Sequence, residues 1–191
     1  MAENSKAVNS TNVFGFWVYI LTDCVIFATL IITYLVLRYA PHTGIETKDI
    51  FDINLVLLET FILLFSSFSF GIALIAANKQ DYKITYIALW ITFLLGLGFI
   101  SIEIYEFLHL IDIGYGWTTS ATFSSFFTLI GTHGLHIVIG LIWILMVIIQ
   151  IKVYGLENDK ILTKIACLGV FWHFLDVIWV CIFTIVYFMG V

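Results

Sequence analysis

The chain has 191 residues, of which 62% are apolar, 11% are charged, and the formal net charge is −5. Soluble domains are about 45–50% apolar and about 25% charged, so this composition excludes an ordinary soluble domain. The mean hydropathy of +1.09 indicates a membrane protein. The eight basic residues are scattered without a basic stripe, which argues against a nucleic-acid partner.

Five apolar runs follow one another along the chain, at residues 14–37, 54–77, 84–108, 123–151 and 165–189. Each exceeds the roughly 20 residues that a helix needs to cross the hydrocarbon core. The first run is too long for a signal peptide and lacks a cleavage site of the A-x-A type. The connectors are short and polar. The sequence therefore predicts an all-α membrane protein with a single domain, built as a five-transmembrane-helix bundle.

The distribution of lysine and arginine predicts the orientation of this bundle. The N-terminal tail, the second connector and the fourth connector would share one side of the membrane, and they carry Lys6, Lys79, Lys83, Lys152, Lys160 and Lys164. The other side has only Arg38 and Lys48. Basic residues are enriched in cytoplasmic loops. We therefore expect the N-terminus in the cytoplasm and the C-terminus outside.

Ionisable residues within the apolar runs are the candidate functional groups. A carboxylate at the centre of a transmembrane helix costs about 2.5–3.5 kcal/mol on insertion scales, so such groups normally face the bundle interior and find partners. We expect a lipid-facing side without any ionisable group at membrane depth. Every helix contributes at least one candidate: Asp23, Glu59, Glu103, Glu106, His133, His136, His173 and Asp176.

Two metal sites are possible from residue types alone. Glu106 and His109 have the E-x-x-H spacing of di-iron bundles, although such a site needs two of these pairs and two further glutamates. Haem would need axial histidines from facing helices, for which His133, His136 and His173 are available at different expected depths. A self-contained haem or di-iron membrane enzyme is thus one alternative.

Two other interpretations need no metal. The ionisable groups can be hydrogen-bonded contacts between closely packed helices, which Gly131, Gly134 and Gly140 would allow. They can also form a proton or ion relay, as intramembrane Asp, Glu and His often do. Transporters commonly show internal repeats or broken helices. Neither is visible in this sequence, so a transporter is the weaker alternative.

Four stretches of the chain resemble, in order and spacing, the signature segments of subunit III of the haem–copper terminal oxidases. T-H-G-L-H and W-H-F-x-D-x-x-W are their specific elements. The resemblance runs from Phe14 to the end, and the second apolar run makes the chain most similar to the cytochrome o, ubiquinol-oxidising branch. The stretches are FWVYILTDC (16–24), GLGFISIEIYEF (96–107), FFTLIGTHGLHIVIG (126–140) and WHFLDVIWVCIF (172–183), with LLETFILLFSSFSFGIA (57–73) in the second run.

The resemblance implies a short form with five helices instead of seven, in a bacterial inner membrane. In this family the haems and copper reside in subunit I, so it implies no catalytic residue, no metal ligand and no cofactor in this chain. It implies direct contact with subunit I, assembly with subunits II and IV, and phospholipid bound between helices. The expected role is accessory: supporting the stability and proton uptake of subunit I. Five-helix subunits of cytochrome c oxidases leave cytochrome c as an alternative electron donor.

The resemblance also implies roles for individual residues. His133, His136, His173 and Asp176 match motif positions of the family but would not be metal ligands. The segment FWHFLDVIWV is then an interior polar contact of a packing subunit. Asp23 matches a buried acidic position that is Glu in the long forms. We expect Asp23 and neighbouring polar groups to modulate proton supply to subunit I.

Overall fold

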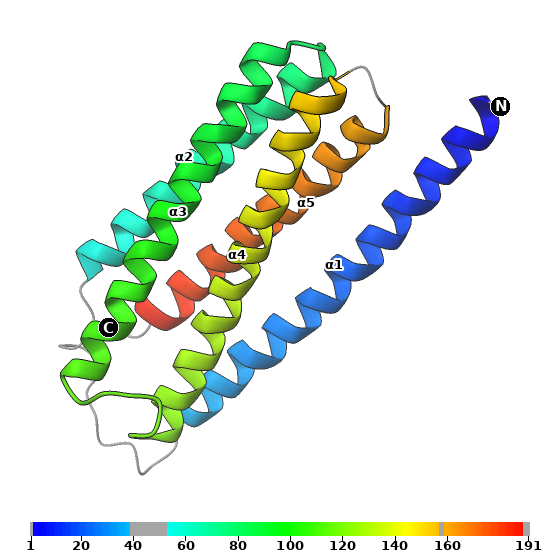
Figure 1. Cartoon of the computed structure of the whole chain (residues 1–191). Helices are drawn as coiled ribbons and strands as arrows, with labels where there is room; N and C mark the ends of the chain where they lie inside the picture. The colour runs from blue at the N-terminus through cyan, green and yellow to red at the C-terminus, as the bar shows by residue number, and fades with distance from the viewer. Residues whose placement is uncertain (1, 39–52, 157–158, 189–191) are drawn as a thin grey trace.

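Helices account for all regular secondary structure in the part of the chain that the computed structural model describes, residues 2–38, 53–156 and 159–188 (Figure 1). Lys48, which entered the predicted orientation, lies outside these residues, as does the end of the last apolar run at 189. The elements are α1 (Ala2–Arg38), α2 (Ile53–Asn78), α3 (Tyr82–Asp112), α4 (Ala121–Tyr154), α5 (Asp159–Ile182) and a terminal π-helix, η2 (Phe183–Phe188).

Five of these helices are long and apolar enough to cross a membrane. Their candidate spans are Val13–Arg38, Ile53–Asn78, Tyr82–Asp112, Ala121–Tyr154 and Lys160–Tyr187. The prediction of an all-α, five-helix membrane protein is confirmed. Most helices extend beyond the apolar runs, for example α5, which begins at Asp159 and not at 165. Hydropathy marks only the part of a helix that lies in hydrocarbon, whereas the helix itself continues into the interface.

Local signals in the connectors decide where helices begin and end. Asp81 caps α3, since its side chain accepts a hydrogen bond from the Ile84 N–H at 3.2 Å. Ser120 caps α4 in the same way through Phe123 N–H, at 3.2 Å. Gly155, with φ of 73°, follows the last residue of α4 and adopts a conformation that favours glycine. Because these caps satisfy backbone groups at the helix ends, each helix can begin or end directly at a short connector.

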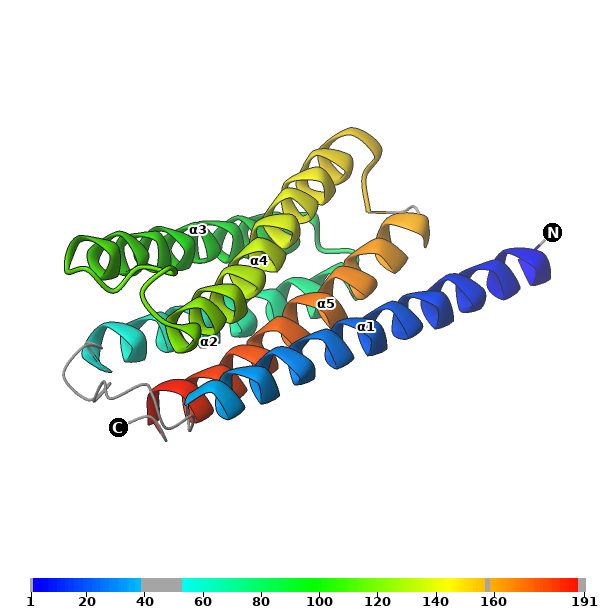
Figure 2. The same cartoon turned by 90° about the horizontal axis from the view of Figure 1, so that it is seen from below.

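The helices form a four-membered bundle with a fifth helix on its edge. α2 contacts α3, α3 contacts α4, α4 contacts α5, and α5 returns to α2. Among the described elements, α1 packs against α4 and α5 only, and it borders the bundle on one side (Figure 1). Seen from below, α5 lies between α1 and α2, on the side away from α3 (Figure 2). Among the described helices, α5 is therefore flanked by α1 and α2, and none of them covers its outer face.

Glycines bring the backbones of α3 and α4 close to a large aromatic side chain of α5. A Cβ at Gly140 would lie 2.9 Å from the Trp172 ring, and one at Gly96 would lie 3.0 Å from it. Trp172 is fully buried, and its indole N–H donates to Ser66 Oγ at 3.0 Å. Small residues at helix contacts permit this close approach in membranes. The core is thus centred where α2, α3, α4 and α5 meet.

Candidate functional site

The polar groups within the membrane spans are mostly inside the bundle. Six of the eight predicted residues are buried: Asp23, Glu59, Glu103, Glu106, His133 and Asp176. The His136 side chain is 13% exposed, whereas that of His173 is 43% exposed. The eight residues do not converge on one centre. They form a carboxyl cluster, an enclosed histidine, a pair between α1 and α4, and a contact between α2 and α5.

The carboxyl cluster joins Glu59 of α2, Glu103 and Glu106 of α3, and Tyr187 of η2. The Tyr187 hydroxyl donates to the Glu106 carboxylate, with distances of 3.4 Å to Oε1 and 3.3 Å to Oε2. Glu103 occupies the space left by Gly134, where a Cβ would lie 2.5 Å from Glu103 Oε1. Both oxygens of Glu59 are buried without a hydrogen-bond partner among the described residues. These acids form a concentrated group of ionisable side chains inside the bundle.

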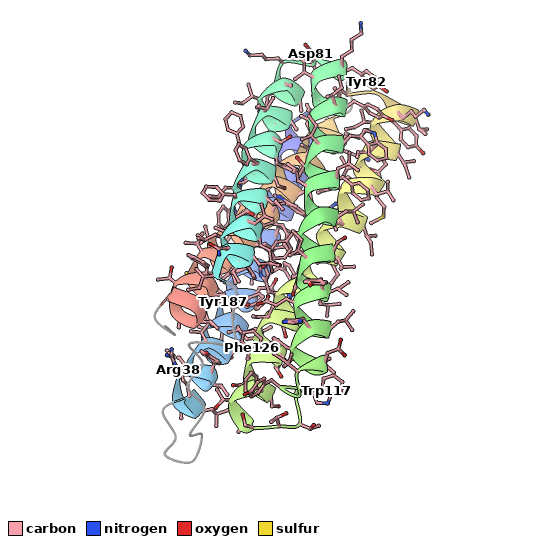
Figure 3. The ribbon with its side chains drawn as sticks, turned by 90° about the vertical axis from the view of Figure 1, so that its left-hand side faces the viewer. Arg38, Asp81, Tyr82, Trp117, Phe126 and Tyr187 are labelled. Atoms are coloured by element: carbon pink, nitrogen blue, oxygen red, sulfur yellow. The ribbon has the colours of Figure 1, made fainter. Side chains whose placement is uncertain are left out.

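The position of Tyr187 places this cluster toward one end of the bundle. Figure 3 shows Tyr187 and Phe126 in the half that contains Arg38 and Trp117, away from Asp81. The rings of Phe126 and Tyr187 are 6.1 Å apart in an edge-to-face arrangement. The π-helical turn at the end of α5 carries Tyr187, and such turns often occur at functional sites. In the predicted orientation, this end faces the outside.

His133 sits in an aromatic enclosure. Its ring stacks on Trp179 with centroids 5.2 Å apart, and Phe99 and Phe27 approach edge-on at 6.0 Å and 6.1 Å. The residue is 0% exposed, and neither ring nitrogen has a hydrogen-bond partner among the described residues. Its contacts are those of a packed aromatic side chain. They link α4 to α1, α3 and α5.

Asp23 and His136 connect α1 to α4. His136 Nε2 lies 3.7 Å from Asp23 Oδ2, which is an ion-pair distance but too long for a good hydrogen bond. His136 Nδ1 lies 2.7 Å from the Thr132 carbonyl oxygen. A carbonyl can only accept, so Nδ1 carries a proton and donates it. This contact fixes the orientation of the ring and points Nε2 toward Asp23.

The motif W-H-F-x-D-x-x-W joins α5 to α2. Trp172 and Trp179 donate their indole N–H groups to Ser66 Oγ at 3.0 Å and Thr60 Oγ1 at 3.1 Å. His173 Nδ1 lies 2.7 Å from Ser67 Oγ. Three polar residues of the motif therefore find a partner on α2. The fourth, Asp176, has Oδ2 at 3.8 Å from His173 Nδ1, and neither of its oxygens has a hydrogen-bond partner among the described residues.

The structure modifies the interpretation of this motif as an interior contact. Trp172 and Asp176 are four positions apart and point inward, whereas His173 is rotated by about 100° from Trp172 around the helix. Its side chain therefore emerges at the rim of the contact with α2, where Ser67 meets it. The motif is interior at Trp172, Asp176 and Trp179 but not at His173.

Sequence reasoning missed the hydroxyl partners. Ser66 and Thr60 receive the two buried indole N–H groups, and Tyr187 joins the carboxyl cluster. Buried tryptophan normally finds a hydrogen-bond acceptor. The run of serines in the second apolar segment was therefore an available signal. Tyr187 had no such signal, because it resembles an interfacial aromatic in the sequence.

Among the described residues, no group of three His, Cys, Asp or Glu side chains could hold a metal ion. The E-x-x-H pair is divided between two environments. Glu106 is buried in the carboxyl cluster, whereas His109 is exposed and stacks on Tyr105 with centroids 6.3 Å apart. His133, His136 and His173 also have separate surroundings, as described above.

A groove between α1 and α4 is a candidate for lipid. Its volume is about 260 Å³. It combines apolar side chains of α1 with hydroxyl groups of both helices, a surface that can accommodate an acyl chain and a polar group. The lining includes Leu30, Thr33 and Leu37 of α1 and Ser124, Ser125 and Thr128 of α4.

Comparisons with known proteins agree on one family. The model of the family "Cytochrome c oxidase subunit III" matches residues 1–191. The chain is 50% identical over 178 residues to cytochrome bo(3) ubiquinol oxidase subunit 3 of Pseudomonas aeruginosa, covering 93% of this chain and 85% of that protein. The subunit of the same name from Buchnera aphidicola subsp. Baizongia pistaciae is 45% identical, with 94% and 95% covered. Quinol oxidase subunit 3 of Bacillus subtilis is 43% identical, with 98% and 92% covered.

Proposed function

Since the chain belongs to the cytochrome c oxidase subunit III family, we propose that it is the third subunit of a bacterial, proton-pumping ubiquinol oxidase of the inner membrane. The observation that carries this proposal is the near full-length similarity to subunits named for quinol oxidation. Cytochrome c as the electron donor is the second candidate, because the family as a whole is named for it.

The role proposed for the chain is accessory, with the haems and copper held by subunit I. The environments of the histidines support this. His133 packs among aromatic rings, His136 is oriented by the Thr132 carbonyl, and His173 contacts Ser67. These contacts serve to join helices. A rigid bundle of this kind can stabilise a neighbouring catalytic subunit during turnover.

The proposed partners are subunit I by direct contact, subunits II and IV in the same complex, and membrane phospholipid. The groove between α1 and α4 supports lipid binding. Asp23 with His136 and the carboxyl cluster support a part in proton uptake by subunit I, because both groups can exchange protons within the membrane. Neither group is proposed to take part in electron transfer.

Turnover of the intact complex tests the electron donor. The complex is purified in mild detergent through a tag on this chain, and oxygen consumption is measured with ubiquinol and with reduced cytochrome c. We expect consumption with ubiquinol that cyanide inhibits and no consumption with cytochrome c. Oxygen consumption with cytochrome c alone would assign the chain to a cytochrome c oxidase. A preparation without any co-purifying oxidase subunit would contradict the proposed function.

A further inference from the structure

His173 lies at the centre of its membrane span. Within the span Lys160–Tyr187, His173 lies 13 residues after the first residue (173 − 160) and 14 residues before the last (187 − 173). At about 1.5 Å per residue, the imidazole is about 20 Å from either end of the helix. The hydrocarbon core is about 30 Å thick. The side chain is therefore far from both headgroup layers.

The imidazole is also open to the surroundings of the chain. Its side chain is 43% exposed, the largest fraction among the eight intramembrane ionisable residues described above. Nδ1 contacts Ser67 Oγ, whereas Nε2 has no hydrogen bond to any described residue. An exposed ionisable group at this depth is unfavourable in lipid, and such groups almost always face protein or a water-filled cavity.

His173 shares a face of α5 with several exposed residues. Ala166, Val177 and Cys181 are exposed and Val170 is half-buried, and together with His173 they form a line with intervals of three or four residues, which places them on one helix face. We call this line the α5 surface strip. Val177 is 61% exposed, and Cys181 is exposed. α1 and α2 flank α5 on its two sides (Figure 2). The α5 surface strip therefore lies between α1 and α2.

Exposed positions near the middle of α3 have a different chemistry. Ile91, Leu94 and Leu97 are 46%, 61% and 42% exposed. Their side chains are entirely apolar, as lipid contact requires. The α5 surface strip has equal exposure at Val177 but carries an imidazole at its centre. The two faces of the bundle are therefore suited to different neighbours.

We propose that the α5 surface strip binds a transmembrane helix of another subunit of the same oxidase, and that this helix presents a hydroxyl, amide or carboxyl group to Nε2 of His173. The proposal rests on the proposed function, which supplies a multi-subunit complex. Acyl chains offer no hydrogen-bonding group, and headgroups do not reach the centre of the bilayer. A helix satisfies its own backbone hydrogen bonds in hydrocarbon and can bring one polar side chain to this depth.

Site-specific photo-crosslinking in the intact complex tests this contact. A benzophenone amino acid replaces Val177 in the strip, and a matched variant carries it at Leu94 of α3, which has the same exposed fraction of 61%. Membranes are irradiated before solubilisation, and adducts are identified by mass spectrometry. We expect Val177 to yield an adduct with another oxidase subunit and Leu94 to yield lipid adducts only.

Three results would overturn the proposal. Lipid adducts alone at Val177 would show that the strip faces the bilayer, and an adduct between two copies of this chain would identify a different occupant. Adducts with another oxidase subunit in equal yield at Val177 and Leu94 would show that the α5 surface strip and the exposed face of α3 do not differ in their neighbours. If oxidase subunits co-purify with the chain in any of these cases, the proposed function still stands. If no oxidase subunit co-purifies, both the proposed function and the proposed helix contact are contradicted.

Substitution of His173 tests the hydrogen bond itself. Interhelical hydrogen bonds in membranes contribute only a modest stabilisation. His173→Phe should therefore raise the ratio of dissociated to complex-bound chain about three- to twentyfold. The ratio is measured in native gels at increasing detergent concentrations. His173→Gln retains a hydrogen-bonding group and should remain close to the unaltered chain. His109→Phe, at an exposed histidine of α3, is the matched control and should have no effect. Unchanged retention of His173→Phe would overturn the predicted contact.

Discussion

Gly140 shows how single residues set the helix spacing in this bundle. A Cβ at this position would lie 2.9 Å from the ring of the buried Trp172, and that ring cannot move freely because α3 and α2 hold its other sides. Gly131, on the same helix, has its nearest neighbour at 3.9 Å from such a Cβ. The two glycines therefore differ in what an added methyl group would meet.

We predict that Gly140→Ala destabilises the chain by about 1–3 kcal/mol, the usual cost of inserting a methyl group into a packed core. Gly131→Ala is the matched control and should change stability little. The measurement is the thermal unfolding midpoint of the purified protein in one detergent. Equal midpoints for the two variants would contradict the close packing around Trp172.

Asp23 is the residue for which we expect an effect on proton supply. Asp23→Asn keeps the shape of the side chain but removes the acid that faces His136 Nε2 at 3.7 Å. In the intact complex, we predict a lower pumping stoichiometry or faster loss of activity during turnover. Asp112→Asn, at an exposed aspartate near the end of α3, is the control. If Asp23→Asn matches the unaltered complex in turnover, pumping and turnover stability, the proposed proton role is wrong.

At the scale of elements, α2 and α5 are joined by hydrogen bonds as well as by apolar packing. Trp172, His173 and Trp179 meet Ser66, Ser67 and Thr60 along one seam. Apolar packing alone gives little specificity between helices in lipid, since acyl chains are equally apolar. The hydroxyl groups therefore help to select the rotation of α5 relative to α2. That rotation also turns His173 outward.

We predict that Thr60→Val destabilises the chain by about 1–3 kcal/mol. The substitution is close to isosteric, but it leaves the buried Trp179 N–H without the acceptor that now lies at 3.1 Å. Thr29→Val removes an exposed hydroxyl that bonds only to its own helix, and it should change stability by less than about 0.5 kcal/mol. Thermal unfolding of both variants compares the two hydroxyls directly. An equal loss in both would show that the seam contributes nothing specific.

The number and class of the elements could be predicted from the sequence, but their rotations could not. Runs of more than 20 apolar residues suffice to indicate spanning helices. An apolar run has no polar face, so it does not reveal which side of α5 points inward. His173 was expected in the interior because ionisable groups at membrane depth normally face the bundle. The separation of Glu106 from His109 likewise depends on how α3 is rotated, although both residues share a helix.

For the whole molecule, the bundle presents two different faces. The middle of α3 exposes the apolar side chains of Ile91, Leu94 and Leu97, whereas α5 carries the strip centred on His173. The proposed attachment of a partner along α5 would bury His173, the most exposed of the eight candidate residues. The cytoplasmic N-terminus stays a prediction from the distribution of lysine and arginine.

Deletion of this subunit tests its accessory role. If the redox centres reside in subunit I, membranes without this chain should still reduce haem with ubiquinol, provided that subunit I assembles. We predict that activity then decays faster during turnover than in the complete complex. The measurements are a substrate-reduced optical spectrum and the time course of oxygen consumption. Complete loss of haem reduction with subunit I present would contradict an accessory role.

The cofactor content of the separated chain tests the central claim most directly. The tagged complex is purified in mild detergent, its optical spectrum and metal content are recorded, and both are measured again after this chain has been stripped from its partners. The account predicts that haem and copper remain with the larger subunits and are absent from the separated chain. Stoichiometric haem or iron in the separated chain would show that its histidines are ligands and would contradict the account.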